Sequence, residues 1–299
     1  RSGISLVAVG GYGRGALSPQ SDLDVMLLHN GWNQEDLEEA AQALWFPVWD
    51  EKIALGHSVR TIAQSIELAS TDLETATSLL SLRHLAGDAE LSDDLAEESS
   101  RTWRKNRRKW LPQIVDDARD RERTNGEVAY LLEPDLKESS GGLRDINAVQ
   151  WIEASGIELL DQERRDLRAA NDVLLAARVE LHRGTSRKGD VLLLEEQDSV
   201  ADALGIGDAD VMMSQVAASA RTITWIADDV FLRVRNSLRR LRLRAGKPKR
   251  IADHVYLVDG TVAIAPGSPV STDQALMLRL AVAAAENEAR LDRDSLDQL

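Results

Sequence analysis

The chain has 299 residues, of which 43% are hydrophobic and 29% charged, and its formal net charge is −14 at pH 7. This length allows two packed domains, and the acidic balance argues against a surface built mainly to bind nucleic acid. No cysteine occurs and no apolar run reaches the length of a membrane span, so the composition excludes disulfides and thiolate zinc sites and predicts neither a membrane partner nor a secretory signal.

The first predicted elements are two short strands joined by a glycine-rich turn. ISLVAVG (residues 4–10) predicts a buried strand, and DLDVMLL (residues 22–28) predicts a second one. Residues i and i+2 of a strand share one face, about 6.6 Å apart, so Asp22 and Asp24 should point the same way. Two carboxylates at this spacing can share one or two Mg²⁺ ions, and Mn²⁺ would also fit. The other interpretation is an edge strand with two solvated aspartates.

The turn between these strands has the composition of a phosphate site. Gly10 and Gly11 lack side chains, so backbone N–H groups there can approach a polyphosphate closely. A branched residue at Gly11 should block that approach and disfavour a positive φ. Arg14 can add a charge-assisted contact to the same anion.

The next segments predict three helices around one further strand. A helix over residues 33–52 begins at a capping Asn33 and should kink or end at Pro47. GHSVRT (residues 56–61) predicts a short strand, and two helices should follow, the second ending at Gly87 and carrying His84. We place an α/β domain at 1–88.

Beyond residue 88 the sequence predicts mainly helices. Residues 92–126 indicate one long charged helix or a pair broken at Pro112, whose basic run Arg101–Lys109 either faces the aspartates or is a solvated face. Later helices are predicted at 143–155, 161–183, 199–204 and 209–244, followed by a hairpin around Asp259-Gly260 and a helix at 272–291. We place a helical domain at 89–250 and a hairpin and helix, packed on that domain, at 251–299.

A second polar motif lies in EPDLKESSGGLRD (residues 133–145). Periodicity alone predicts a loop and then a helix that begins near Leu143, where a phosphate could bind. Lys137 and Arg144 are the cations of this segment. An ion pair of Arg144 with Asp145 or Glu133 is the structural alternative.

The strand, Gly-Gly turn and Asp-x-Asp strand resemble the nucleotidyltransferase superfamily that includes DNA polymerase beta. GGYGRG-LSP-SD-D together with EPD-K---GGLRD is similar to the bacterial PII uridylyltransferases, and the similarity spans roughly residues 4 to 235. The arginine-rich composition suggests the actinobacterial type of this family. The resemblance implies an α+β fold, in which a small polymerase-beta-like nucleotidyltransferase domain precedes a mostly helical domain. GHSVRT carries no third carboxylate, which many superfamily members have, and we assign no such role to Asp50, Glu51 or Asp72.

The resemblance implies Mg²⁺-dependent transfer of UMP or AMP, from UTP or ATP, to a tyrosine of the cytoplasmic nitrogen-signalling protein PII. It gives Asp22 and Asp24 the catalytic and metal-binding roles. Nucleotide binding is expected of five residues: Gly10, Gly11, Arg14, Lys137 and Arg144. Two alternatives stay open: a nucleotidyltransferase with another acceptor, and a non-catalytic module that senses nucleotide or PII.

The family also carries a nucleotide-removing hydrolase domain and glutamine-sensing domains. We expect this chain to be the transferase portion of a longer protein, without reversal of the modification and without a response to glutamine.

Overall fold

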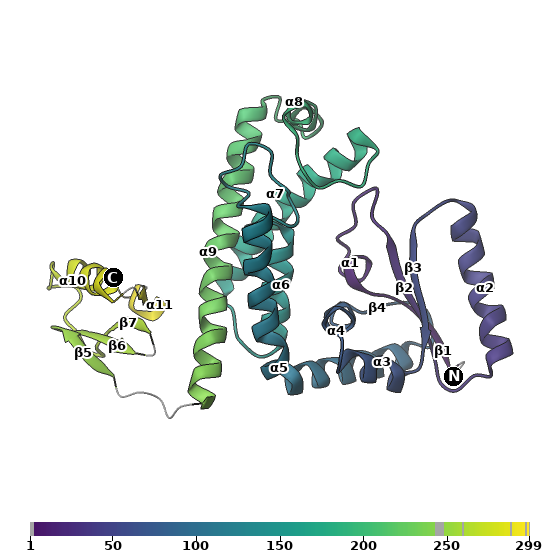
Figure 1. Ribbon diagram of the computed structural model, residues 1–299, viewed down its shortest axis with the longest axis horizontal. Helices are drawn as coiled ribbons and strands as arrows, with labels where there is room; N and C mark the ends of the chain where they lie inside the picture. Colours follow the sequence, from purple (N-terminus) through teal and green to yellow (C-terminus); the bar gives the residue numbers. More distant parts are fainter. Residues whose placement is uncertain (1–2, 243–247, 259, 288, 297, 299) are drawn as a thin grey trace. The chain divides into compact units, whose positions relative to one another are not determined.

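The structure is a computed structural model that describes residues 3–242, 248–258, 260–287, 289–296 and 298. The chain forms two compact units, Arg1–Phe231 and Leu232–Leu299 (Figure 1). Their boundary lies inside the long helix α9 (Ala209–Arg242). The domain limits 1–88, 89–250 and 251–299 stay predictions.

A four-stranded mixed sheet opens the first unit. Its strands lie in the order β3-β2-β1-β4, and their bounds are β1 Ile4–Ala8, β2 Leu23–His29, β3 Leu55–Arg60 and β4 Arg83–Gly87. Strand β1 is antiparallel to β2 and β4, whereas β2 and β3 are parallel. This mixed sheet, followed by a mostly helical region, confirms the α+β class.

Helices cover both faces of this sheet (Figure 1). On one face α2 (Gln34–Asp50) packs Trp45 against Val25 and Leu27. On the other face α3 (Ile62–Ala69) brings the Ser65 hydroxyl to 3.6 Å from the Met26 sulfur. Alternate residues of β2 are thus buried by different helices, which leaves the polar start of the strand at an open end of the sheet.

Local capping fixes where the helices of this domain begin. The Asn33 side chain accepts from the Asp36 N–H at 3.0 Å and starts α2, and a Thr61–Gln64 capping box starts α3. Helix α2 continues past Pro47 to Asp50, so of the two predicted effects of the proline the end is wrong and the kink stays a prediction.

The predicted helix that ends at Gly87 is replaced by a shorter helix and a strand. Helix α4 (Leu73–Leu79) ends early, and β4 then pairs with β1. His84 consequently lies on a strand, where its Nδ1 is 2.9 Å from the Ser92 hydroxyl. Gly87 has φ +90°, and a Cβ there would lie 2.5 Å from the Ile4 carbonyl oxygen. The close approach of this backbone to β1 is therefore what makes the segment a strand.

The remainder of the first unit is helical. Its helices are α5 Ala89–Asn125, α6 Leu143–Ala154, α7 Asp161–Thr185, α8 Leu194–Ala203 and the first part of α9. Helices α7, α8 and α9 meet in a core that includes Leu136, Leu181, Leu192 and Val216, all at most 1% exposed. No helix in the described ranges is both apolar enough and long enough to cross a membrane.

Helix α5 is a single helix that runs past Pro112. It buries Trp103 and Trp110 while its basic run remains at the surface, where Arg101 pairs with Glu97 and Glu98. Lys109 donates to the Ser70 carbonyl at 2.8 Å. The basic run is therefore largely a solvated face.

The second unit contains its own small sheet and core. Its strands β5 Lys249–Ala252, β6 Val255–Val258, β7 Thr261–Ile264 and β8 Arg290–Leu291 lie in this order, and its helices after α9 are α10 Leu276–Glu286 and α11 Arg293–Leu296. Strands β6 and β7 form the predicted hairpin; Asp259 lies outside the described residues. The predicted helix at 272–291 is shorter than expected because Arg290 and Leu291 pair with β7.

Candidate active site

One cavity of about 370 Å³ collects the predicted functional residues of the first unit. It lies between the open end of the sheet and the helices α6 and α7. All seven predicted residues line it: Gly10, Gly11, Arg14, Asp22, Asp24, Lys137 and Arg144. The basic run of α5 is not part of this lining. The structure therefore brings the two sequence motifs to one place, although more than 100 residues separate them.

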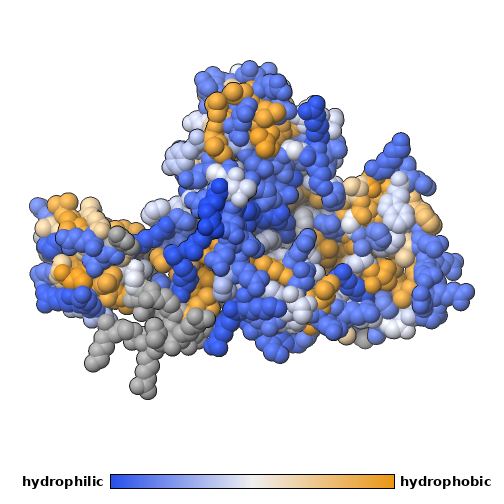
Figure 2. All heavy atoms as spheres, in the orientation of Figure 1, coloured by the Kyte–Doolittle hydropathy of each residue, from blue (hydrophilic) through white to orange (hydrophobic). Residues whose placement is uncertain are grey.

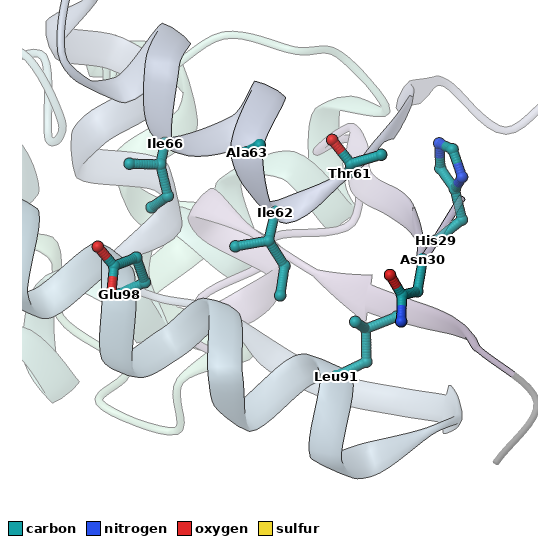
Figure 3. Close-up of a pocket in the computed structure, with 8 residues that line it drawn as sticks. All are labelled: His29, Asn30, Thr61, Ile62, Ala63, Ile66, Leu91 and Glu98. Atoms are coloured by element: carbon teal, nitrogen blue, oxygen red, sulfur yellow. The ribbon is translucent and has the colours of Figure 1, made fainter. Parts of the chain in front are cut away.

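A larger cavity of about 440 Å³ lies elsewhere, between the end of β2, α3 and α5 (Figure 3). It is lined by His29, Asn30 and apolar side chains such as Ile62 and Ile66, with Glu98 as its one charged lining residue within the described chain. A cavity without a cation is poorly suited to a polyphosphate. The smaller, charged cavity is the candidate active site.

Asp24 is the second residue of β2, and Asp22 directly precedes the strand. The Asp24 carbonyl accepts from the Val9 N–H at 3.0 Å, which joins the strand to the glycine turn. The Lys188 ammonium lies 2.6 Å from Asp22 Oδ2. This lysine comes from the segment after α7 and was missed by the sequence analysis.

The charge on Asp24 is poorly compensated. Burial raises the pKa of Asp24, and the neighbouring charges of Asp22 and Glu74 raise it further, against the opposing effects of Lys188 and Arg14. Burial likewise lowers the pKa of Arg14, and Arg144 adds to this effect. The carboxylates near Asp24 repel one another, and so do Arg14 and Arg144. A ligand that carries both positive and negative charge, such as a metal-bound polyphosphate, would offset both repulsions.

Two glycines make room for the Asp24 carboxylate. A Cβ at Gly56, its neighbour on β3, would lie 2.4 Å from Asp24 Oδ1. A Cβ at Gly10, whose φ is +55°, would lie 3.2 Å from Asp24 Oδ2. The positive φ expected at Gly11 is instead at Gly10, because α1 (Gly10–Gly13) begins there.

A buried ion network supports the opposite wall of the cavity. Arg178 donates to Asp190 at 2.6 Å and to the Ser18 hydroxyl at 2.7 Å, and His182 contacts Asp190 at 2.8 Å. Burial alone would raise the pKa of Asp190, but the hydrogen bonds of Arg178 and His182, with the Lys137 charge, hold it below its usual value. Because Ser18 precedes Asp22 in the same loop, this network also holds the carboxylate loop in place.

The GGLRD motif forms a tight turn into α6. Asp145 accepts from the Gly141 N–H at 2.8 Å and from Arg121 at 2.7 Å. Gly141 has φ +78°, and a Cβ there would lie 2.7 Å from the Ala220 carbonyl oxygen. This part of the motif is structural, because it closes the turn against α9.

The structural alternative for Arg144, an ion pair with Asp145 or Glu133, is wrong. Arg144 instead pairs with Glu138 at 3.0 Å. Asp145 is already bound by Arg121, and Glu133 accepts from the Leu194 N–H at the start of α8. Arg144 therefore lines the cavity with its charge partly neutralised by a loop carboxylate.

Three further lining residues were not singled out from the sequence: Glu74, Arg178 and Lys188. Both Arg178 and Lys188 lie within residues 4–235, over which the family resemblance extends. Glu74, in the first turn of α4, is the only acid besides Asp22 and Asp24 among the described residues that line the cavity. No described group of three acidic or histidine side chains is close enough to hold a metal ion alone.

Two family models of known proteins match parts of this chain. Residues 1–65 match a family model described as a nucleotidyltransferase domain, and residues 109–231 match one described as GlnD PII-uridylyltransferase. The chain belongs to the PII-uridylyltransferase family. It carries the nucleotidyltransferase part of that family and is thus of the nucleotidyltransferase class of enzymes.

Several relatives share the name bifunctional uridylyltransferase/uridylyl-removing enzyme. The protein from Streptomyces coelicolor is 44% identical over the whole chain, and that from Mycobacterium tuberculosis is 36% identical over the whole chain. The protein from Corynebacterium glutamicum is 33% identical over 95% of it. The chain spans only 37%, 38% and 40% of the length of these three relatives.

Proposed function

We propose that this chain transfers UMP or AMP from UTP or ATP to a tyrosine hydroxyl of the PII protein, with release of pyrophosphate. The observation that supports the proposal best is the cavity in which Asp22 and Asp24 face a wall of cations from the helical part. The family description supplies PII as the acceptor, and the relatives' names supply uridylyl transfer. Such substrates would place the reaction in the cytoplasm.

The residues of the cavity fit a divalent metal ion, Mg²⁺ in our proposal. Asp22 and Asp24 offer hard oxygen ligands, and the raised pKa of Asp24 indicates an excess of negative charge that a cation would offset. Two protein carboxylates leave the other ligand positions for water and phosphate oxygens, as Mg²⁺ prefers. When bound, the ion would offset charge on the phosphates and lower the pKa of the attacking hydroxyl.

The cations of the cavity fit the triphosphate. Arg14 and Arg178 can donate to phosphate oxygens from opposite walls, while Lys137 and Arg144 contribute charge from the loop before α6. Lys188 is exposed, and among the described residues its ammonium pairs with Asp22, so we expect it to exchange this carboxylate for a phosphate when the donor binds. Its contact with Asp22 therefore holds the Lys188 ammonium, before the donor binds, close to where a phosphate would lie.

The proposed reaction is an in-line displacement at the α-phosphorus. The tyrosine oxygen forms the new bond to phosphorus while the bond to the pyrophosphate oxygen breaks, and the phenolic proton passes to water. Asp22 and Asp24 would hold the metal ion that offsets charge on the α-phosphate, and the arginines and lysines hold the leaving pyrophosphate. This division of roles follows the distribution of charge in the cavity.

The test is incubation of the chain with purified PII, Mg²⁺ and each NTP in turn, followed by intact mass measurement of PII. We expect PII to gain the mass of one UMP or AMP per subunit, and no gain with PII whose acceptor tyrosine is replaced by phenylalanine. NTP binding without any gain would favour a sensor module instead. Modification of another protein but not PII would favour a different acceptor.

A further inference from the structure

A second cavity of about 240 Å³ meets the active-site cavity at Asp24. The two share Asp24, Glu74 and Ser78, and the second continues along β3, past Gly56 and Ser58. We propose that the acceptor protein presents its hydroxyl on an extended segment that pairs with the free edge of β3 and reaches Asp24 through this second cavity. The inference rests on the proposed transfer reaction and adds to it the surface that receives the acceptor.

The distribution of charge decides which cavity takes which substrate. Five cations line the first cavity: Arg14, Lys137, Arg144, Arg178 and Lys188. Among the described residues that line the second, Arg60 is the only arginine or lysine, and it is accompanied by Asp72 and Glu74. Pyrophosphate therefore belongs in the first cavity. Since attack is in line with the leaving group, the acceptor should arrive from the other side of Asp24, where the second cavity opens.

The edge of β3 can hold a polypeptide by its backbone. Strand β3 is the outer strand of the sheet and pairs only with β2. The Leu23 N–H donates to the Ala54 carbonyl at 2.9 Å, so alternate residues from Ala54 onward direct their backbone groups at β2. The intervening residues, His57 and Val59, direct N–H and C=O toward the free edge, where an added strand would bond to them.

Gly56 keeps the path from this edge to Asp24 open. It lies beside Asp24 in the parallel register, and any side chain there would collide with the Asp24 carboxylate. An added strand would lie two strand spacings from β2, about 10 Å. A long side chain that crosses over Gly56 can span this gap with its terminal hydroxyl, whereas a serine cannot. The geometry thus selects a tyrosine on an extended segment.

The opposite side of the edge suits apolar neighbours of the acceptor residue. Trp49 is 41% exposed and stacks edge-on against His57, with ring centroids 5.3 Å apart, and Val59 is 36% exposed. The hydropathy surface shows apolar side chains gathered over this first domain between hydrophilic ones (Figure 2). Residues that flank the tyrosine in an extended segment would point to this side, so apolar or aromatic flanking residues should bind best.

The edge is tested by variants at Val59. Val59→Pro removes one outward N–H, a change that an edge strand tolerates, and Val59→Glu places a charge beside the edge without removing the N–H. The matched control is Ala86→Glu, at an exposed position of β4, the other outer strand of the same sheet. For each variant, KM for PII, the Kd for NTP with Mg²⁺, and thermal unfolding are measured.

We expect Val59→Pro to raise KM for PII about tenfold, the scale of one or two net hydrogen bonds, with the Kd for NTP unchanged. Val59→Glu should raise KM less, and Ala86→Glu should leave it unchanged. An unchanged KM in both Val59 variants, or an equal rise in the Ala86 control, would overturn the proposal. Absence of any PII modification by the unaltered chain would instead overturn the proposed function, so the two failures are distinct.

Hydrogen exchange of the unaltered protein provides a test without a variant. Addition of PII with a non-hydrolysable NTP analogue should slow amide exchange in residues 55–60 and leave residues 83–87 unchanged. If PII binds, as judged by slower exchange elsewhere, while residues 55–60 exchange as before, the acceptor does not pair with β3.

Discussion

The two walls of the active-site cavity hold their charges in opposite ways. On the sheet wall, burial and the nearby charges of Asp22 and Glu74 raise the pKa of Asp24. On the helical wall, Arg178 and His182 hold the pKa of Asp190 below its usual value despite its burial. Asp190 is thus held by bonded partners, whereas the cations near Asp24 do not outweigh its burial and the neighbouring carboxylates. We infer that Asp190 and His182 are scaffold that holds Arg178 toward the cavity, and that the carboxylates of Asp22 and Asp24 are where the metal ion binds.

The sharpest test of this contrast removes the carboxylate charges of the sheet wall. We expect Asp22→Asn and Asp24→Asn each to lower transfer to PII by about 10³-fold or more, because each removes an oxygen ligand of the proposed metal ion. The raised pKa means that ionised Asp24 costs folding free energy at neutral pH, so Asp24→Asn should unfold at the same temperature or slightly higher. Near-normal transfer by folded variants would rule out the metal role.

Asp190→Asn is the matched change on the helical wall. It leaves buried Arg178 without its charged partner and should lower the free energy of unfolding by about 3 kcal/mol at pH 7. Because folding lowers the pKa of Asp190, its ionised carboxylate stabilises the fold fully above about pH 4. This stabilisation is lost as the pH falls through the pKa of Asp190 in the folded protein. The difference between variant and parent should therefore shrink in acid. Urea unfolding at pH 7 and pH 3 checks this; equal stabilities at pH 7 would contradict the scaffold role.

A smaller effect is expected where the backbone makes room for Asp24. Gly56→Ala places a Cβ against Asp24 Oδ1 and should displace the carboxylate, which would lower transfer by about 10²-fold. Gly184→Ala is the control, since a Cβ there meets nothing within 4 Å and lies in helix α7. Comparable turnover by the two variants would show that the position of Asp24 does not depend on Gly56.

The sheet wall was largely predictable from sequence because its signals are local. The spacing of Asp22 and Asp24 fixes their shared direction, and Gly10 marks the turn beside them. The position of β4 was not predictable, because the segment around His84 becomes a strand only through pairing with β1.

The helical wall was predictable in its motif but not in its contacts. Lys188 reaches Asp22 across 166 positions, and Arg178 reaches Ser18 across 160. Such pairs depend on how α7 lies against the sheet domain, which no short-range pattern encodes. The pairing of Arg144 with Glu138 was missed for the opposite reason: several acids lie within reach in the sequence, and only the turn at Gly141 and Gly142 selects among them.

The measurement that tests the central claim most directly is calorimetric titration with UTP and with ATP, in Mg²⁺ and in chelator, of the unaltered chain, Asp24→Asn and Asp190→Asn. The account predicts that the unaltered chain binds one of the two nucleotides much more tightly with Mg²⁺. It also predicts that Asp24→Asn loses this Mg²⁺ dependence and that folded Asp190→Asn keeps it. Equal binding with and without Mg²⁺ in the unaltered chain, or full Mg²⁺ dependence in Asp24→Asn, would contradict the assignment of the sheet wall as the metal and nucleotide site.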